Sequence, residues 1–148
     1  MSESTKKTTG YALNLFLITL SISITHAEPV IDVPDKIPGT TLIYSEDVID
    51  LNESVPNLLI IDSRISSDRK HGYIEGSVNL PDIETDCKKL ANIITTKKSP
   101  VLFYCNGIKC GRSGEAAIIA LQCGYTNIYW FRGGFEEWKS KNFPFIKP

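Results

Sequence analysis

The chain has 148 residues, of which 42% are hydrophobic, and its formal net charge is −1 at pH 7. This length supports one domain with a substantial core and is too short for two ordinary domains. The balanced charge, without a basic stripe, argues against a nucleic-acid partner. Four cysteines are too few for a disulfide-framework scaffold. Without paired Cys-x-x-Cys motifs, the sequence also argues against a structural zinc site.

The first residues have the pattern of an export signal. Two lysines precede a mostly apolar stretch over residues 11–24, and Thr25 and Ala27 supply small side chains at the positions needed for cleavage before Glu28. The apolar stretch has about 14 residues, fewer than the roughly 20 that cross a bilayer as a helix. We therefore expect residues 1–27 to be a signal peptide and the mature protein to be periplasmic or secreted. An uncleaved N-terminal membrane anchor is the alternative.

The remainder divides into a lead-in and a domain. Prolines and a glycine over residues 28–40 predict an extended lead-in, and residues 41–148 form the expected domain. Ser45, followed by two acidic residues, predicts a helix that ends near Asn52. Three apolar runs have the pattern of strands buried on both faces of a parallel sheet. They are residues 58–61, 101–104 and 127–131.

Helices are predicted between and after these strands. One begins near residues 82–85, another follows the cysteine-containing loop and ends at Gly124, and residues 135–140 form a short last helix. The first two carry apolar residues at i, i+3, i+4 and i+7 and so have one buried face each, with both of their cysteines expected in the core. These residues are Cys87, Leu90, Ala91 and Ile94, then Ala116, Ile119, Ala120 and Cys123. The alternation predicts an α/β fold, a mostly parallel sheet flanked by helices on both faces.

The segment after the second predicted strand carries the strongest functional signal. Cys105 stands at the carboxyl end of this strand, and a glycine-rich loop joins it to the next helix. The loop N–H groups and the helix N-terminus are expected to favour a Cys105 thiolate and to bind a small anion, with positive charge from Lys109 and Arg112. The candidate substrate-binding residues are Asn106, Gly107, Ile108, Lys109, Cys110, Gly111 and Arg112.

Three segments, in this order, resemble the single-domain rhodaneses, a sulfurtransferase family. Residues 61–64 (Ile-Asp-Ser-Arg) and residues 72–81 (Gly-Tyr-Ile-Glu-Gly-Ser-Val-Asn-Leu-Pro) resemble the family's Asp-x-Arg and Gly-His-Ile-x-Gly-Ala-x-Asn-x-Pro elements. The cysteine loop is the second segment. Residues 132–138 (Arg-Gly-Gly-Phe-Glu-Glu-Trp) are similar to the closing Gly-Gly-x-x-x-Trp. The resemblance spans about residues 41–148 and implies the three-layer rhodanese-like fold.

The resemblance implies transfer of sulfane sulfur. A donor such as thiosulfate, a persulfide or a polysulfide would give its outer sulfur to Cys105, and a thiol or cyanide acceptor would remove it from the resulting persulfide. The resemblance implies no metal or organic cofactor, and a thiol-carrying protein is a further candidate partner. The chain departs from the family pattern in two places. Tyr73 stands where the family usually has His, and Arg112 and Ser113 come two residues later than in a common Cys-x-x-Gly-x-Arg-Ser loop, which puts the preferred donor in question.

Several side chains keep more than one interpretation. Cys105 is either the nucleophile or a small buried hydrophobe. Cys110 forms a reversible disulfide with Cys105, is itself the nucleophile, or is an incidental loop residue. Arg112 either binds the donor anion or braces the loop. Asp62 and Arg64 are expected to form a structural salt bridge, with a substrate contact by Arg64 as the alternative. The aromatic side chains expected in the core and pocket wall are Trp130, Phe131 and Trp138.

Two other functions compete with sulfur transfer. The first is that of a fold-related phosphatase or arsenate reductase, whose Cys-x5-Arg loop is one residue shorter than the Cys-x6-Arg spacing of Cys105 and Arg112. The second is a non-catalytic rhodanese-like binding or redox module, in which Cys105 and Cys110 form a disulfide or hold Cu(I). Neither of the two histidines is well placed, so a Cys-His protease or Ser-His-Asp hydrolase is poorly supported.

Overall fold

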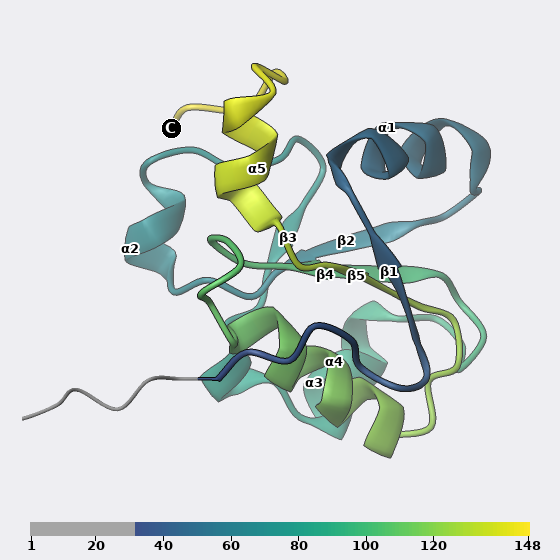
Figure 1. The fold of residues 1–148 in the computed structure, drawn as a ribbon. Coiled ribbons are helices and arrows are strands. Elements are labelled where there is room, and N and C mark those ends of the chain that lie inside the picture. Colours follow the sequence, from purple (N-terminus) through teal and green to yellow (C-terminus); the bar gives the residue numbers. More distant parts are fainter. Residues whose placement is uncertain (1–31) are drawn as a thin grey trace, which may run out of the picture.

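A computed structural model describes residues 32–148. Its centre is a five-stranded sheet of order β1-β5-β4-β2-β3, in which all neighbouring strands are parallel (Figure 1). The strands are β1 (Thr40–Ile43), β2 (Leu59–Asp62), β3 (Val78–Asn79), β4 (Val101–Tyr104) and β5 (Ile128–Phe131). The predicted signal peptide and residues 28–31 of the predicted lead-in lie outside the described residues.

The three predicted strands are confirmed as β2, β4 and β5. All four residues of β4 are buried, because β2 and β5 flank this strand and helices cover both of its faces. The sequence predicts neither β1 nor β3, since neither carries a continuous apolar run. β1 is an edge strand with two polar residues, and β3 has only two residues and pairs with β2 alone. Short edge strands of this kind are defined by their pairing rather than by their own composition.

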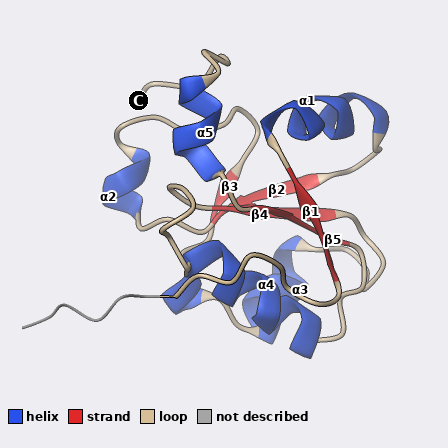
Figure 2. Ribbon diagram, viewed as in Figure 1, coloured by secondary structure: helices blue, strands red, loops and turns tan. Residues whose placement is uncertain are grey.

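Helices cover both faces of the sheet, which confirms the predicted three-layer α/β fold (Figure 2). On one face, α1 and α5 contribute Val48 and Trp138 to a core with the sheet. On the other face, α3 and α4 contribute Leu90 and Ala116 to a second core. The helices are α1 (Ser45–Ser54), α2 (Ser66–Arg69), α3 (Cys87–Ile93), α4 (Arg112–Gln122) and α5 (Gly134–Ser140), with the 3-10 helix η1 (Asp82–Glu84) before α3.

Two helix starts differ from the sequence prediction. Ser45 is the first residue of α1, and Tyr44 rather than Ser45 is its N-cap. The helix expected to begin within residues 82–85 is divided into η1 and α3. α3 begins only after Asp86, whose carboxylate accepts a hydrogen bond of 2.7 Å from the Lys89 N–H and so caps the helix.

Cys87 and Cys123 form a disulfide with Cα atoms 5.4 Å apart. The prediction that both lie in the core is wrong for Cys87, whereas Cys123 packs against the core. Cys87 is exposed at the start of α3, and Cys123 is half-buried directly after α4. The apolar spacing identifies the buried face of α4, but only in part that of α3, where Leu90 and Ile94 are buried and Ala91 is exposed. Both cysteines lie at helix ends, at the rim of the core. The disulfide therefore ties α3 to α4. Within residues 32–148, no helix has the length and apolar character needed to cross a bilayer.

Candidate active site

Cys105 follows β4 at the carboxyl edge of the sheet, where parallel α/β sheets bind ligands. The first turn of α5 holds this part of the chain in place. The Phe135 N–H donates to the Cys105 carbonyl (2.9 Å), and the Glu136 N–H donates to the Asn106 carbonyl (2.7 Å). Gly134 allows this close approach, because its φ is 57° and a Cβ there would meet the backbone of Cys105 and Asn106. The start of the cysteine loop is therefore fixed by the first turn of α5.

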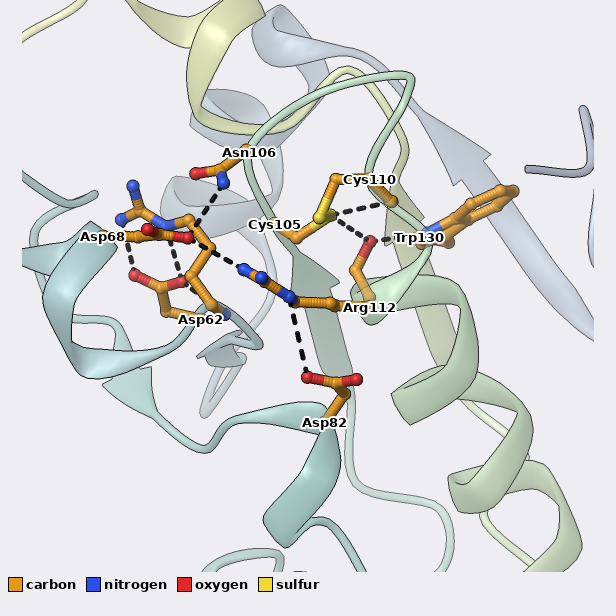
Figure 3. The surroundings of a disulfide bond; sticks show 10 residues. Asp62, Asp68, Asp82, Cys105, Asn106, Cys110, Arg112 and Trp130 are labelled. Atoms are coloured by element: carbon orange, nitrogen blue, oxygen red, sulfur yellow. Dashed lines mark hydrogen bonds and ion pairs between the residues drawn. A yellow bond between two sulfur atoms is a disulfide. The ribbon is translucent and has the colours of Figure 1, made fainter. Parts of the chain in front are cut away.

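Cys105 and Cys110 are joined by a disulfide, with Cα atoms 6.3 Å apart (Figure 3). Cys105 is 0% exposed, whereas Cys110 is partly exposed. The bond is the first of the three states that the sequence allows for Cys110, and its reversibility stays a prediction. In this bonded form Cys105 is neither ionisable nor open to solvent, so any nucleophilic role requires the disulfide to be reduced.

Ser113, which the sequence does not predict in the site, contacts the sulfur of Cys105, and Trp130, expected in the core and pocket wall, orients the Ser113 hydroxyl. The Ser113 hydroxyl donates to Cys105 Sγ over 3.3 Å, and the Trp130 indole N–H donates to Ser113 Oγ over 3.0 Å. Because the indole occupies a lone pair of the hydroxyl, the Ser113 proton is directed at the sulfur. Ser113 is fully buried, so water does not compete for this proton. Once the disulfide is reduced, a hydroxyl placed in this way favours negative charge on Cys105 Sγ.

Some backbone groups around Cys105 favour a negative charge on its sulfur, and one opposes it. Within the described residues, the N–H groups of Arg112, Ser113 and Gly114 have no hydrogen-bond acceptor, as is usual in the first turn of a helix. They give the N-terminus of α4 a partial positive charge near Cys105. The Cys110 carbonyl oxygen, 2.9 Å from Cys105 Sγ, opposes a thiolate. The expected stabilisation therefore depends on the Ser113 hydroxyl and the helix terminus outweighing one carbonyl.

Arg112 is held by carboxylates on the far side of the loop. Its guanidinium donates to Asp68 over 2.8 Å, and its Nε lies 4.0 Å from Asp82. Asp68 also accepts a hydrogen bond of 2.9 Å from the Asn106 side chain (Figure 3). Partial burial raises the pKa of Asp68, but the bonds from Asn106 and Arg112 outweigh it and lower that pKa below its ordinary value. Of the two predicted roles of Arg112, this geometry favours bracing the loop. Asp68 was missed because α2, which carries it, is too short to be predicted.

We call these contacts of Asp68 with Arg112 and Asn106 the Asp68 clamp. A buried ion-pair network lies beside it. Arg64 donates to both carboxylate oxygens of Asp62 (2.8 and 2.7 Å), and Tyr104 donates to the same carboxylate (2.8 Å). Burial opposes the charge of Arg64, but Asp62 outweighs it and raises the pKa of the guanidinium. Burial and Asp62 together raise the pKa of Tyr104. The predicted structural salt bridge is confirmed, and Arg64, 1% exposed and stacked on Phe135, offers no surface to a substrate.

The loop also borders an open pocket of about 240 Å³, lined by Asn106, Gly107, Lys109, Cys110 and Glu136. Cys110, not Cys105, is the cysteine that reaches it. Lys109 brings a positive charge to this pocket, and Glu136 brings a negative one. Ile108 is 55% exposed and faces a different hollow, near Arg132. Among residues 32–148, no group of three or more His, Cys, Asp or Glu side chains is arranged to hold a metal ion.

A parallel sheet covered on both faces, with a cysteine at the head of the loop after β4, defines an α/β protein with a thiol-based site. The chain belongs to the rhodanese-like domain family, whose domain matches residues 45–141. It is 38% identical over 82 residues to the uncharacterized protein YqhL of Bacillus subtilis, covering 55% of this chain and 61% of that protein. It is 31% identical over 100 residues to the rhodanese domain-containing protein CG4456 of Drosophila melanogaster, covering 57% of this chain and 85% of that protein. The chain thus spans about three fifths of the length of its curated bacterial relatives.

Solved structures share the fold. The BH2092 protein of Bacillus halodurans superimposes with a TM-score of 0.64 at 20% identity, covering 72% of this chain and 77% of that one. The polysulfide-sulfur transferase of Wolinella succinogenes has a TM-score of 0.61 at 20% identity, covering 73% of this chain and 79% of that one. The thiosulfate sulfurtransferase of Pseudomonas aeruginosa has a TM-score of 0.59 at 21% identity, covering 72% of this chain and 20% of that one. The structural neighbours of this chain therefore include sulfurtransferases.

Proposed function

We propose that the protein is a sulfurtransferase that carries sulfane sulfur on Cys105. The Cys105 thiolate attacks the outer sulfur of a donor such as thiosulfate; the Cys105–sulfur bond forms, the donor's sulfur–sulfur bond breaks, and sulfite leaves. A thiol or cyanide then takes the outer sulfur and restores the thiolate. Covalent catalysis of this kind divides one transfer into two easier steps.

The observation that carries this proposal is the environment of Cys105 Sγ. The Ser113 hydroxyl points at the sulfur, and Ser113 belongs to the first turn of α4, whose first N–H groups have no acceptor within residues 32–148. Both favour an anionic sulfur, whether thiolate or terminal persulfide. The two named sulfurtransferases among the structural neighbours support the same chemistry. Since Cys105 is buried and bonded to Cys110, the active form is the reduced protein.

A phosphatase or arsenate reductase is less well supported. Such an enzyme needs an arginine free to bind a tetrahedral oxyanion, and here the Arg112 guanidinium is held by Asp68 and Asp82. Opening the site to an oxyanion would break these contacts and leave two carboxylates beside the bound anion.

A cyanide assay tests the proposal. The protein is reduced, freed of reductant and mixed with thiosulfate and cyanide, and thiocyanate is measured. We expect thiocyanate from the wild type and none from Cys105→Ser. The double variant Cys87→Ser/Cys123→Ser, altered only at the α3–α4 disulfide, is the matched control and keeps the activity. Thiocyanate from Cys105→Ser, or hydrolysis of p-nitrophenyl phosphate in place of sulfur transfer, would contradict the proposal.

A further inference from the structure

We propose that Cys110 discharges the Cys105 persulfide internally, so that the protein reduces sulfane sulfur to sulfide and is itself oxidised to the Cys105–Cys110 disulfide. This inference rests on the proposed function, because it begins from a persulfide on Cys105. It adds a second reaction and assigns a catalytic role to Cys110. The disulfide in the structure is then the oxidised product of one turnover.

The backbone places the two sulfurs within reach of each other. The Cα atoms of Cys105 and Cys110 are 6.3 Å apart, inside the range of about 4.4–6.8 Å that disulfides span. A turn holds Cys110 there, since its N–H donates to the Gly107 carbonyl over 2.8 Å. The other end of the loop is fixed by the bonds from α5 to Cys105 and Asn106. An attacking thiol held in this way has a high effective concentration and so competes with an acceptor in solution.

The step is a thiol–disulfide exchange with a defined balance. The Cys110 thiolate attacks Cys105 Sγ, the inner sulfur of the persulfide. The Cys105 Sγ–Cys110 Sγ bond forms, the bond from Cys105 Sγ to the outer sulfur breaks, and the outer sulfur leaves as hydrosulfide with the proton of the Cys110 thiol. The two cysteines are oxidised, and the sulfane sulfur is reduced to sulfide. No oxidant or metal takes part.

Burial favours this internal route over attack at the inner sulfur from solution. Cys105 lies at the buried end of the loop, 0% exposed in the bonded form, so an external thiol has to enter the site to reach its Sγ, whereas Cys110 is held within bonding range of it. Cys110 in turn lines the open pocket with Asn106, Lys109 and Glu136. A reductant therefore attacks Cys110 Sγ, and Cys105 leaves as the thiolate that the Ser113 hydroxyl stabilises. The co-reactant that completes the cycle is a dithiol, such as the paired thiols of a redox protein.

A single-turnover experiment tests the step. The Cys87→Ser/Cys123→Ser protein, in which only Cys105 and Cys110 remain, is reduced and freed of reductant under anaerobic conditions. Thiosulfate or an alkanethiosulfonate is added, because neither donor releases sulfide when it loads a thiol. We expect about one sulfide per chain with no external thiol present, loss of both alkylatable thiols, and a Cys105–Cys110 disulfide in the peptide map. The Cys110→Ser variant in the same background should keep the extra sulfur on Cys105 and release sulfide only after dithiothreitol is added.

The outcomes separate the inference from the proposed function. If both proteins retain the sulfur on Cys105, sulfur loading stands and the role of Cys110 falls. The same holds if the sulfur moves to Cys110 without sulfide, or if the Cys110→Ser variant releases sulfide as fast as its parent. If the Cys110→Ser variant gains no sulfur on Cys105 from either donor, the proposed function itself is wrong, and the inference falls with it.

Discussion

Ser113 is the side chain whose contacts bear most directly on the reactivity of Cys105. Its hydroxyl is fully buried, accepts a hydrogen bond from the Trp130 indole N–H and donates one to the sulfur of Cys105. The sequence predicts Cys105 at the head of the loop, because an apolar run that ends in a cysteine is visible in one dimension. It does not predict the part played by Ser113 and Trp130, since these residues meet Cys105 only when α4 and β5 pack beside β4.

Removal of the Ser113 hydroxyl should make the Cys105 thiol harder to ionise. A hydrogen bond to a charged group contributes about 1.5–3 kcal/mol, so Ser113→Ala should move the ionisation about 1 to 2 pH units upward. The measurement is the pH dependence of alkylation of Cys105 as the sole cysteine, with Cys87, Cys110 and Cys123 replaced by serine. Ser140→Ala, on the exposed side of α5, is the control. An unchanged profile in Ser113→Ala would show that this hydroxyl does not support the thiolate.

At the scale of elements, α2 and the cysteine loop are joined through one carboxylate. Asp68 of α2 accepts hydrogen bonds from Asn106 and from Arg112 at the start of α4. Long apolar strands and amphipathic helices are predictable because their periodicity reports burial. The four-residue α2 has no such periodicity, and it is tied to the buried Asp62 through Arg69 at its end, which donates over 3.0 Å. The clamp around Arg112 could therefore not be foreseen from the sequence.

The Asp68 clamp should respond to pH in a defined direction. The pKa of Asp68 is lower in the folded protein than its ordinary value of 3.8. The ionised carboxylate therefore adds its full stability above pH 3.8, and this stability is lost as the pH falls through the lowered pKa of the folded protein. Asp68→Asn should therefore destabilise the protein by about 1 kcal/mol at pH 7, with a smaller difference near pH 3. Urea unfolding at both pH values measures this, with Asp35→Asn, at an exposed carboxylate, as the control. A difference that stays constant between the two pH values would rule out the carboxylate as its source.

At the scale of the molecule, all four cysteines are paired, two across α3 and α4 and two within the active-site loop. Disulfides that serve structure persist in oxidising compartments. Together with the N-terminal sequence pattern, this supports the proposal that the protein is exported. A sulfide-releasing cycle would then need a dithiol partner on the same side of the membrane.

Export predicts a processed chain in the host cell. We expect the mature protein to begin near Glu28 and to be recovered from the periplasmic or extracellular fraction, with Cys87 and Cys123 resistant to alkylation until a reductant is added. Intact mass and alkylation of the isolated protein measure both properties. A full-length chain in the cytoplasmic fraction with four free thiols would contradict export.

Sulfur transfer requires Cys105 to accept sulfane sulfur, and the most direct test is the mass of the reduced protein after exposure to thiosulfate. The Cys110→Ser variant holds the intermediate for analysis, since the internal route is closed. We predict a gain of one sulfur atom per chain, located on Cys105 by peptide mapping and removed by cyanide as thiocyanate. An unchanged mass, or an added sulfur on any other residue, would contradict the account.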